Sequence, residues 1–406
     1  MSEVKIKKLH VIETSPRGDI NLVCLKVETN QPGLYGLGCA TFTQRYSAVT
    51  TVINDFIAPL VTGRGVDSIH DIWQVCMSDS YWRNGPVLNN SISALDEALW
   101  DIKGKMAGMP VYELLGGKCR EGIELYHHCD GRTPQEVEDN ARKLMEQGYR
   151  NIRVQQGFYG GNMKGCRQDF VSPTGAPEDG TYYDPDQYFR TTVELLGYLR
   201  DKLGEKVGLC HDVHERLTPV KAIALAKELE PFHLLFLEDA LPPEQADWFR
   251  HMRQQTAVPI AIGELFVNPM EYIHLIDERL IDYIRCHLSM IGGLTPAIKL
   301  AHLCEAHGIR TAWHGPFDIT PVGLAAQLHL DLACSNFGIQ EYCTMTELER
   351  DMFPGAPVMR NGYLYVNDKP GFGVDIDEKL ATKYPAHYND NAWLRPRLPD
   401  GTTVRG

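Results

Sequence analysis

The stretch LCHDVHERLTP, residues 209–219, places two histidines and two acids at the end of an apolar run. The preceding residues, VGLC at 207–210, have the composition of a buried strand. Asp212 and His214 follow that strand at once. A carboxylate and an imidazole two residues apart, at the end of a core strand, indicate a catalytic or ligand-binding position.

Two further apolar runs end in a carboxylate. Asp212 ends VGLCH, Glu238 ends LLFL and Glu264 ends PIAIG, and successive carboxylates are 26 residues apart. A strand and its following helix in a barrel are about that long, and active sites of such barrels lie at the carboxyl ends of the strands. The spacing therefore predicts that three neighbouring strands present a carboxylate at one rim.

Three converging carboxylates favour a bound metal ion. Like charges at short distance raise the pKa values of some of the carboxyls, unless a cation balances them. Ligation by oxygen alone favours a hard divalent ion, and we expect Mg²⁺ on Asp212, Glu238 and Glu264. The alternative, solvated acids or helix caps, fits any one of these residues, but it fits three in register less well.

Two histidines follow strands on the same expected rim. His214 lies two residues beyond Asp212, and His314 follows the strand-like residues RTAW. An imidazole is a natural proton donor to a leaving hydroxide near pH 7. Each histidine alone is more often an ordinary hydrogen-bonded side chain. Asp318, four residues after His314, either orients that histidine, binds substrate hydroxyls or caps a helix that begins near ITPVGLAA.

Arg153, Arg285 and Glu341 end the second, sixth and eighth expected strands. An arginine in such a place can bind a substrate carboxylate through paired hydrogen bonds. The alternative is an arginine that pairs with the acids of the rim. The residues themselves leave both readings open.

Short apolar runs alternate with amphipathic stretches after about residue 122. Thr-Pro pairs at 133, 218 and 295 indicate helix starts, with Glu136 closing a capping box on Thr133. Strands that alternate with helices pair in parallel, and eight of them close into a (β/α)₈ barrel. The eight expected strands are IELYHHC, NIRVQ, VGLCHD, LLFLED, PIAIGE, IDYIRC, RTAWH and FGIQEY.

The first 120 residues have a different pattern. VKIKKLHVIET and INLVCLKVET alternate with period two, which predicts an antiparallel meander, and PGLYGLG follows as a turn-rich break. SISALDEALWDIKGKMAG predicts a helix that stops at glycine. We therefore expect an α+β capping domain over residues 1–120, completed by the tail from about 365 to 406. Residues 121–364 are expected to form the barrel with the metal site.

The composition is that of an ordinary globular protein. The 406 residues carry a net charge of −13 and are 43% hydrophobic and 23% charged. The acidic balance argues against nucleic acid and anionic membrane as partners. Eleven dispersed cysteines indicate reduced thiols, and the first residues lack a signal-peptide pattern, so we expect a cytoplasmic protein. No run reaches the length of about 18 apolar residues that spans a bilayer.

The chain as a whole resembles the mannonate dehydratase subgroup of the enolase superfamily, which includes the D-galactonate dehydratase family members. The resemblance rests on a set of motifs: YWRNGPVLNNSISALDEALWDIKGK, VYELLGG, HDVHERLTP, LEDALPPE, AIGELF, LIDYIRC, GGLT, HGPFDITPV, NFGIQEY and KPGFGVDIDEKLATKYP. It implies an enolase-like fold, an α/β modified TIM barrel with a capping domain.

The resemblance also implies a reaction. Mg²⁺ on Asp212, Glu238 and Glu264 would stabilise an enediolate formed by abstraction of the proton alpha to a carboxylate. Loss of the β-hydroxyl would then turn an acid sugar such as D-mannonate or D-gluconate into a 2-keto-3-deoxy sugar acid. His214 would be the acid that helps water leave. The implied substrate-binding residues are Thr43, His128, Arg285, His314, Asp318 and Glu341, and such barrels commonly form homo-oligomers.

The sequence departs from the subgroup at three places. Thr43, in CATFTQRY, stands where efficient relatives have a substrate-contacting Asn, and Pro316 stands where they have Ala. The subgroup's base is a Tyr that follows the strand-two arginine at a longer distance. Here Tyr159 is the nearest candidate, and Arg153 beside it would lower the pKa of its phenol.

Racemisation or cycloisomerisation usually calls for a Lys-x-Lys base, which Arg153-Val154-Gln155 replaces. A regulatory member that binds metal and acid sugars without efficient turnover is the remaining alternative.

Overall fold

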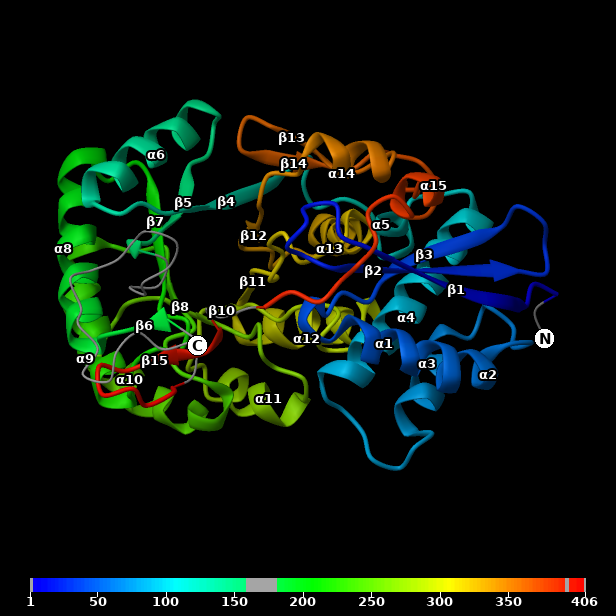
Figure 1. The fold of residues 1–406 in the computed structure, drawn as a ribbon, viewed down its shortest axis with the longest axis horizontal. Coiled ribbons are helices and arrows are strands. Elements are labelled where there is room, and N and C mark those ends of the chain that lie inside the picture. Colours follow the sequence, from blue (N-terminus) through cyan, green and yellow to red (C-terminus); the bar gives the residue numbers. More distant parts are fainter. Residues whose placement is uncertain (1–2, 158–180, 391–393, 405–406) are drawn as a thin grey trace. The chain divides into compact units, whose positions relative to one another are not determined.

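The computed structural model, which describes residues 3–157, 181–390 and 394–404, divides into two compact units (Figure 1). The predicted boundary at residue 120 stays a prediction. Unit 1 comprises Met1–Glu124, Glu264–Tyr272 and Arg285–Asn389, and unit 2 comprises Leu125–Gly263, Ile273–Ile284 and Asp390–Gly406.

Unit 2 is built on parallel strands that alternate with helices. The order of the strands in its main sheet is β4-β5-β7-β8-β9-β10, and all five neighbouring pairs are parallel. The predicted runs from IELYHHC to IDYIRC therefore contain strands, as expected. The strands are β4 (Ile123–Cys129), β5 (Asn151–Val154), β7 (Gly208–Asp212), β8 (Phe236–Glu238), β9 (Ile260–Ile262) and β10 (Tyr283–Ile284), with the first two residues of β4 in unit 1.

The helices of unit 2 alternate with these strands along the chain, and α8 packs against both α6 and α9, which Figure 1 shows in green at the left of the view. α6 begins where the Thr-Pro pair at 133 predicts, because the Thr133 side chain accepts a hydrogen bond from the Glu136 amide. The Glu136 carboxylate accepts from Arg132 rather than Thr133. The remaining elements are α6 (Pro134–Glu146), β6 (Thr181–Tyr182), α8 (Pro185–Leu203), α9 (Pro219–Leu229), η3 (Glu230–Phe232), η4 (Pro243–Trp248), α10 (Phe249–Gln255) and β15 (Pro396–Arg397); α11 (Pro269–Asp277) crosses the division.

Unit 1 begins with the expected meander, but it has three strands instead of two. β1 (Ile6–Thr14) pairs antiparallel with β2 (Leu22–Thr29), which pairs with β3 (Tyr35–Cys39). The reading of PGLYGLG as a break was wrong at its second half. Its glycines let a helix approach, because a Cβ on Gly36 or Gly38 would lie 2.0 or 1.9 Å from a carbonyl oxygen of α4.

The helix in question, α4 (Pro86–Ala107), confirms the prediction over SISALDEALWDIKGKMAG and extends it at the amino end. Gly108 ends it in the left-handed conformation, at φ 67°. Its buried apolar face packs on β2 and β3, and each fully buried Leu or Ile side chain contributes roughly 1.5–3 kcal/mol. The helices around this core are η1 (Thr43–Arg45), α1 (Tyr46–Val52), η2 (Ile53–Ile57), α2 (Ala58–Val61), α3 (Ile69–Ser78) and α5 (Val111–Leu114).

Two predicted helix starts differ from the structure in unit 1. α12 begins at Leu294, so Gly293 and not Thr295 is its N-cap. α13 begins at Pro321 with Thr320 as its cap, which removes the capping role that was one reading of Asp318. The later elements of unit 1 are β11 (Arg310–Thr311), α12 (Leu294–His307), α13 (Pro321–Ala333), β12 (Gln340–Glu341) and α14 (Glu347–Met352).

Part of the expected tail lies against the first strand of unit 1, whereas residues 390–406 belong to unit 2, so the assignment of the whole tail to the capping domain stays a prediction. Thr14 at the end of β1 donates to the carbonyl of Tyr384, at 2.9 Å. The tail contains a hairpin of β13 (Val358–Arg360) and β14 (Tyr363–Tyr365), followed by the short helix α15 (Glu378–Ala381), which the sequence reading missed.

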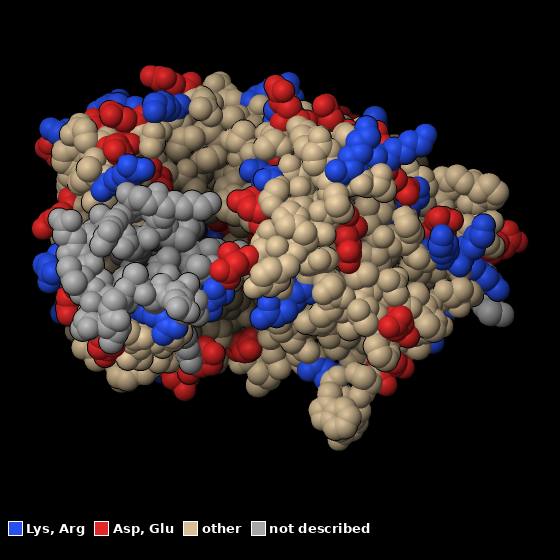
Figure 2. All heavy atoms as spheres, viewed as in Figure 1, with Lys and Arg blue, Asp and Glu red and all other residues tan. Residues whose placement is uncertain are grey.

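On the face shown in Figure 2, acidic and basic side chains are interspersed. Among the described residues, no helix has the length and apolar character needed to cross a bilayer.

Candidate active site and metal centre

Asp212 and Glu238 lie side by side at the carboxyl ends of β7 and β8. They are the last residues of their strands, and they are register partners in the parallel pairing. Both are fully buried. The predicted meeting of these two carboxylates at a strand-end rim is therefore visible within unit 2.

Arg153 joins these carboxylates to β4 and β5. Its Nη1 lies 3.0 Å from Asp212 Oδ2 and 3.0 Å from Glu238 Oε1, and its Nη2 lies 3.0 Å from the Nδ1 of His128. His128 and Arg153 are register partners on the neighbouring strands. The structure thus shows the reading in which the arginine pairs with the rim acids, and the guanidinium reduces the repulsion between them.

Two residues of this rim were missed by the sequence reading. Asp239 directly follows Glu238, and its carboxylate lies within 4.8 Å of those of Asp212 and Glu238. The Tyr126 hydroxyl, on β4, donates to Glu238 Oε2 at 3.2 Å. The acidic pair in LEDA was a signal for Asp239, whereas Tyr126 looked like any buried aromatic residue of a strand.

The turn after β7 accounts for the unusual HDVHER stretch. His214 and Glu215 both adopt left-handed backbone, at φ 51° and φ 60°. The His214 amide donates to Asp212 Oδ1 at 2.7 Å, and the Glu215 amide donates to the Asp239 carbonyl at 2.8 Å. Strained backbone of this kind persists where surrounding contacts hold it and is often found at functional sites.

A second cluster of predicted site residues lies in unit 1. Arg285 is fully buried, with Nη1 3.2 Å from Glu264 Oε2 and Nη2 2.8 Å from Glu341 Oε2. His314 Nδ1 lies 3.1 Å from each of the same two oxygens. Asp318 is more distant, at 3.9 Å from His314 Nε2. The structure thus places Arg285 and His314 against the carboxylates of Glu264 and Glu341, with Asp318 on the far side of His314.

The charges of this cluster set the protonation of its histidines. Burial opposes the charged form of His314, but Glu264 and Glu341 outweigh it and raise the pKa well above the usual value. Burial lowers the pKa of the neighbouring His287 to about 3. Burial raises the pKa of Asp318, and His314 acts in the opposite direction. The two carboxylates thus favour the charged form of His314, whereas burial favours the neutral form of His287.

Thr43 is buried in unit 1, and its hydroxyl oxygen accepts the Asn21 amide at 2.9 Å, which ties it to the start of β2. Tyr159, the candidate base, lies outside the described residues.

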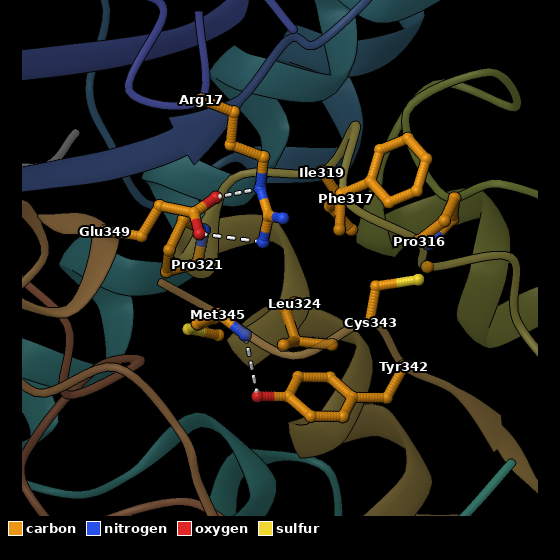
Figure 3. A pocket seen from close by; sticks show the side chains of 11 residues that line it. Arg17, Pro316, Phe317, Ile319, Pro321, Leu324, Tyr342, Cys343, Met345 and Glu349 are labelled. Atoms are coloured by element: carbon orange, nitrogen blue, oxygen red, sulfur yellow. Dashed lines mark hydrogen bonds and ion pairs between the residues drawn. The ribbon is translucent and has the colours of Figure 1, made fainter. Parts of the chain in front are cut away.

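A pocket beside the HGPFD segment is shown in Figure 3. Arg17, from the turn between β1 and β2, lines one side of it. Its Nε and Nη2 bind the Glu349 carboxylate at 2.8 and 2.7 Å, and Nη2 also donates to the Thr344 carbonyl. The rest of the lining is largely apolar. The lining residues are Arg17, Gly315, Pro316, Phe317, Ile319, Pro321, Leu324, Tyr342, Cys343, Met345 and Glu349.

The carboxyls of unit 2 fit a hard divalent cation. Asp212, Glu238 and Asp239 each offer one oxygen within 4.8 Å of the others, and all three residues are buried. Arg153 contributes one positive charge to this group of three carboxyls. Oxygen ligands and excess negative charge are the conditions under which proteins bind Mg²⁺. Glu264 lies two residues beyond β9 and belongs to unit 1.

Comparison with known proteins identifies the family. Residues 136–380 match the enolase C-terminal domain-like family, and residues 2–116 match the N-terminal domain of mandelate racemase and muconate lactonizing enzyme. The chain belongs to the enolase superfamily. The expected fold class, a modified TIM barrel with an α+β capping domain, is thereby confirmed.

Several close members of the superfamily share the full length of this chain. A D-galactonate dehydratase family member of Enterocloster bolteae is 55% identical, with 100% of both chains covered. The D-galactonate dehydratase family member RspA of Pantoea ananatis is 52% identical, also over 100% of both. The crystal structure of an enolase from Pantoea ananatis with bound D-gluconate and Mg is 52% identical, with a TM-score of 0.96 and 100% of both chains covered.

Proposed function

We propose that this protein is an Mg²⁺-dependent dehydratase that converts an acid sugar, an aldonate such as D-gluconate or D-mannonate, into a 2-keto-3-deoxy sugar acid. The observation that carries the proposal is the likeness, at a TM-score of 0.96, to an enolase that holds D-gluconate and Mg. The three buried carboxyl groups of Asp212, Glu238 and Asp239 support the assignment of a metal ion to this site. Glu264 is the third ligand that we propose with Asp212 and Glu238.

Bound Mg²⁺ would neutralise the negative charge that develops on the substrate carboxylate as its alpha proton leaves. We propose that the Tyr159 phenolate removes that proton, which leaves an enediolate. Arg153 would hold the phenolate form, because a guanidinium lowers the pKa of a neighbouring phenol. His214 then gives a proton to the departing β-hydroxyl, which leaves as water, and the resulting enol becomes the 2-keto acid.

The remaining site residues would bind the sugar. His128 contacts Arg153 at the rim of unit 2. In unit 1, Arg285 and His314 supply positive charge, while Glu341 and Asp318 can accept hydrogen bonds from sugar hydroxyls. Thr43 completes the proposed set. We also propose that the protein forms a homo-oligomer, which light scattering coupled to size exclusion tests.

The test is a screen of aldonates that includes D-gluconate, D-mannonate and D-galactonate, with Mg²⁺, in deuterated water. We expect a 2-keto-3-deoxy product from at least one of them, measured by the absorbance of its semicarbazone. Deuterium at the alpha carbon without product would mean that proton abstraction works but the acid step at His214 fails. Binding of an aldonate without exchange or product would contradict the proposal and favour a regulatory member of the family.

A further inference from the structure

Two glutamines meet in the interior of unit 1, and neither belongs to the proposed metal or sugar site. Gln327 lies on α13 and Gln340 on β12, and both are fully buried. Gln340 Nε2 donates to Gln327 Oε1 at 3.1 Å. Buried amides are retained where their hydrogen bonds are made, because leaving one unpaired costs about 1–3 kcal/mol.

The glutamine pair binds the backbone carbonyls of two proposed sugar-binding residues, His314 and Glu341, and of Trp313. Gln327 Nε2 donates to the His314 carbonyl at 2.6 Å. Gln340 Nε2 lies 3.2 Å from the Trp313 carbonyl and 2.8 Å from the Glu341 carbonyl. The two side chains therefore connect residues 313 and 314, which follow β11, to the end of β12. Those are the segments that carry His314 and Glu341.

Gly315 shows how closely the backbone approaches this pair. A Cβ on Gly315 would lie 2.6 Å from Gln340 Nε2 and 2.7 Å from Gln327 Oε1, closer than such atoms approach in proteins. The Gly315 amide donates to Glu341 Oε2 at 3.0 Å. Only glycine leaves room for the two amides and this amide-carboxylate bond at once.

We propose that Gln327 and Gln340 are positioning residues, which hold His314 and Glu341 at the separation that the sugar site requires. The inference rests on the proposed function, since it is the acid sugar that these two residues would bind. The pair acts through the backbone and through Gly315. It fixes the backbone positions from which the His314 and Glu341 side chains extend. Small displacements of such groups reduce turnover by as much as about 100-fold.

Gln327→Met is the first test, because methionine fills a similar volume without these hydrogen bonds. We expect kcat/KM for the aldonate to fall about 10- to 100-fold, with a rise in KM, because the sugar loses oriented partners. We also expect faster hydrogen exchange in the ligand-free protein at the Gly315 amide and in the peptide over 312–318. The exchange arm needs no substrate, so it judges the pair even if no aldonate is turned over, in which case the proposed function fails separately.

His329→Leu is the matched control. His329 lies on the same helix and is equally buried, and it binds the Tyr112 amide at 3.0 Å and the Phe372 carbonyl at 3.3 Å. The His329→Leu variant should have a lower melting temperature, but its KM and the hydrogen exchange of the peptide over 312–318 should equal those of the wild type. Should Gln327→Met fail to fold, Gly315→Ala provides the second variant, with the same expected effects. Wild-type KM and wild-type exchange in the folded variant would overturn the proposal.

Discussion

At the scale of single residues, Glu238 links the proposed metal site to Arg153 and to Tyr126. The Glu238 carboxylate accepts hydrogen bonds from Arg153 and from Tyr126. The residue is fully buried and is the register partner of Asp212. Neutralising it removes both a ligand charge and a partner of the guanidinium. The residue is therefore the most direct place to test the metal site.

Glu238→Gln is expected to reduce Mg²⁺-dependent activity by more than about 100-fold, since changing even the residues behind a metal ligand typically costs about 10- to 100-fold. The loss should be partly recovered at high Mg²⁺ concentration, measured as the rate against metal concentration. Glu228→Gln, on the exposed side of α9, serves as the control and should behave as wild type. Unchanged metal dependence in Glu238→Gln would remove it from the ligand set.

A different buried acid governs stability rather than chemistry. Asp96 is buried on α4, where its Oδ2 accepts the Thr295 amide at 2.8 Å. Burial raises its pKa to about 7, and burial also raises the pKa of the adjacent Glu97. Between the unfolded value of about 3.9 and about 7, the unfolded chain releases the Asp96 proton while the folded chain keeps it. The free energy of unfolding therefore falls as pH rises through this window.

Asp96→Asn should remove that part of the pH dependence, because an amide oxygen still accepts the Thr295 amide but does not ionise. We expect the fall in unfolding free energy between pH 4.5 and 7.5 to be smaller in the variant by about 1–4 kcal/mol. Urea unfolding at the two pH values measures it, with the exposed Asp55→Asn as control. Parallel pH profiles for Asp96→Asn and wild type would contradict the prediction.

At the scale of elements, the contact between β3 and α4 depends on the absence of side chains at Gly36 and Gly38. A Cβ atom at Gly36 would lie 2.0 Å from the Ala98 carbonyl oxygen, and one at Gly38 would lie 1.9 Å from that of Ala94. This spacing explains why a segment that reads as a turn forms a strand: the glycines serve close packing of strand on helix rather than a bend.

Gly38→Ala should lower the free energy of unfolding by about 1–3 kcal/mol, since a methyl group 1.9 Å from a helix carbonyl forces the elements apart. Gly197→Ala is the opposing control. It lies within α8, and its Cβ would meet Phe232 at an ordinary 3.5 Å, so the same substitution should stabilise by up to about 1 kcal/mol. Equal denaturation midpoints for the two variants would be evidence against the close packing.

At the scale of the whole molecule, we expect the acidic balance and the buried carboxyls of Asp212, Glu238 and Asp239 to make stability dependent on cations. The chain carries 53 acidic and 40 basic residues. A cation that binds the folded protein and not the unfolded chain stabilises it by about 2.7 kcal/mol at 100 times its Kd.

Addition of Mg²⁺ to protein treated with EDTA should therefore raise the melting temperature by several degrees, since about 1 kcal/mol corresponds to roughly 2–4 °C in larger domains. Differential scanning fluorimetry measures the shift, and sodium chloride at equal ionic strength controls for screening. Glu238→Gln should lose most of the rise. An equal rise in that variant would mean that the ion acts elsewhere on the surface.

The sequence by itself determined the alternation of strands and helices in the later part of the chain, the superfamily and the kind of metal site to expect. Strand-end acids at a constant spacing indicated a metal, and the motifs around them indicated the superfamily, because both signals are local in the chain. The tertiary structure alone decided which groups pair: Arg153 with two carboxylates, Asp239 beside them, and Gln327 with Gln340 behind His314 and Glu341. Arg153 is 59 residues from Asp212 and 85 from Glu238 in the chain, and these groups meet only because parallel strands in register bring their ends together. Gln327 and Gln340 meet because the fold brings a side chain of α13 to one of β12, which periodicity along the chain does not reveal.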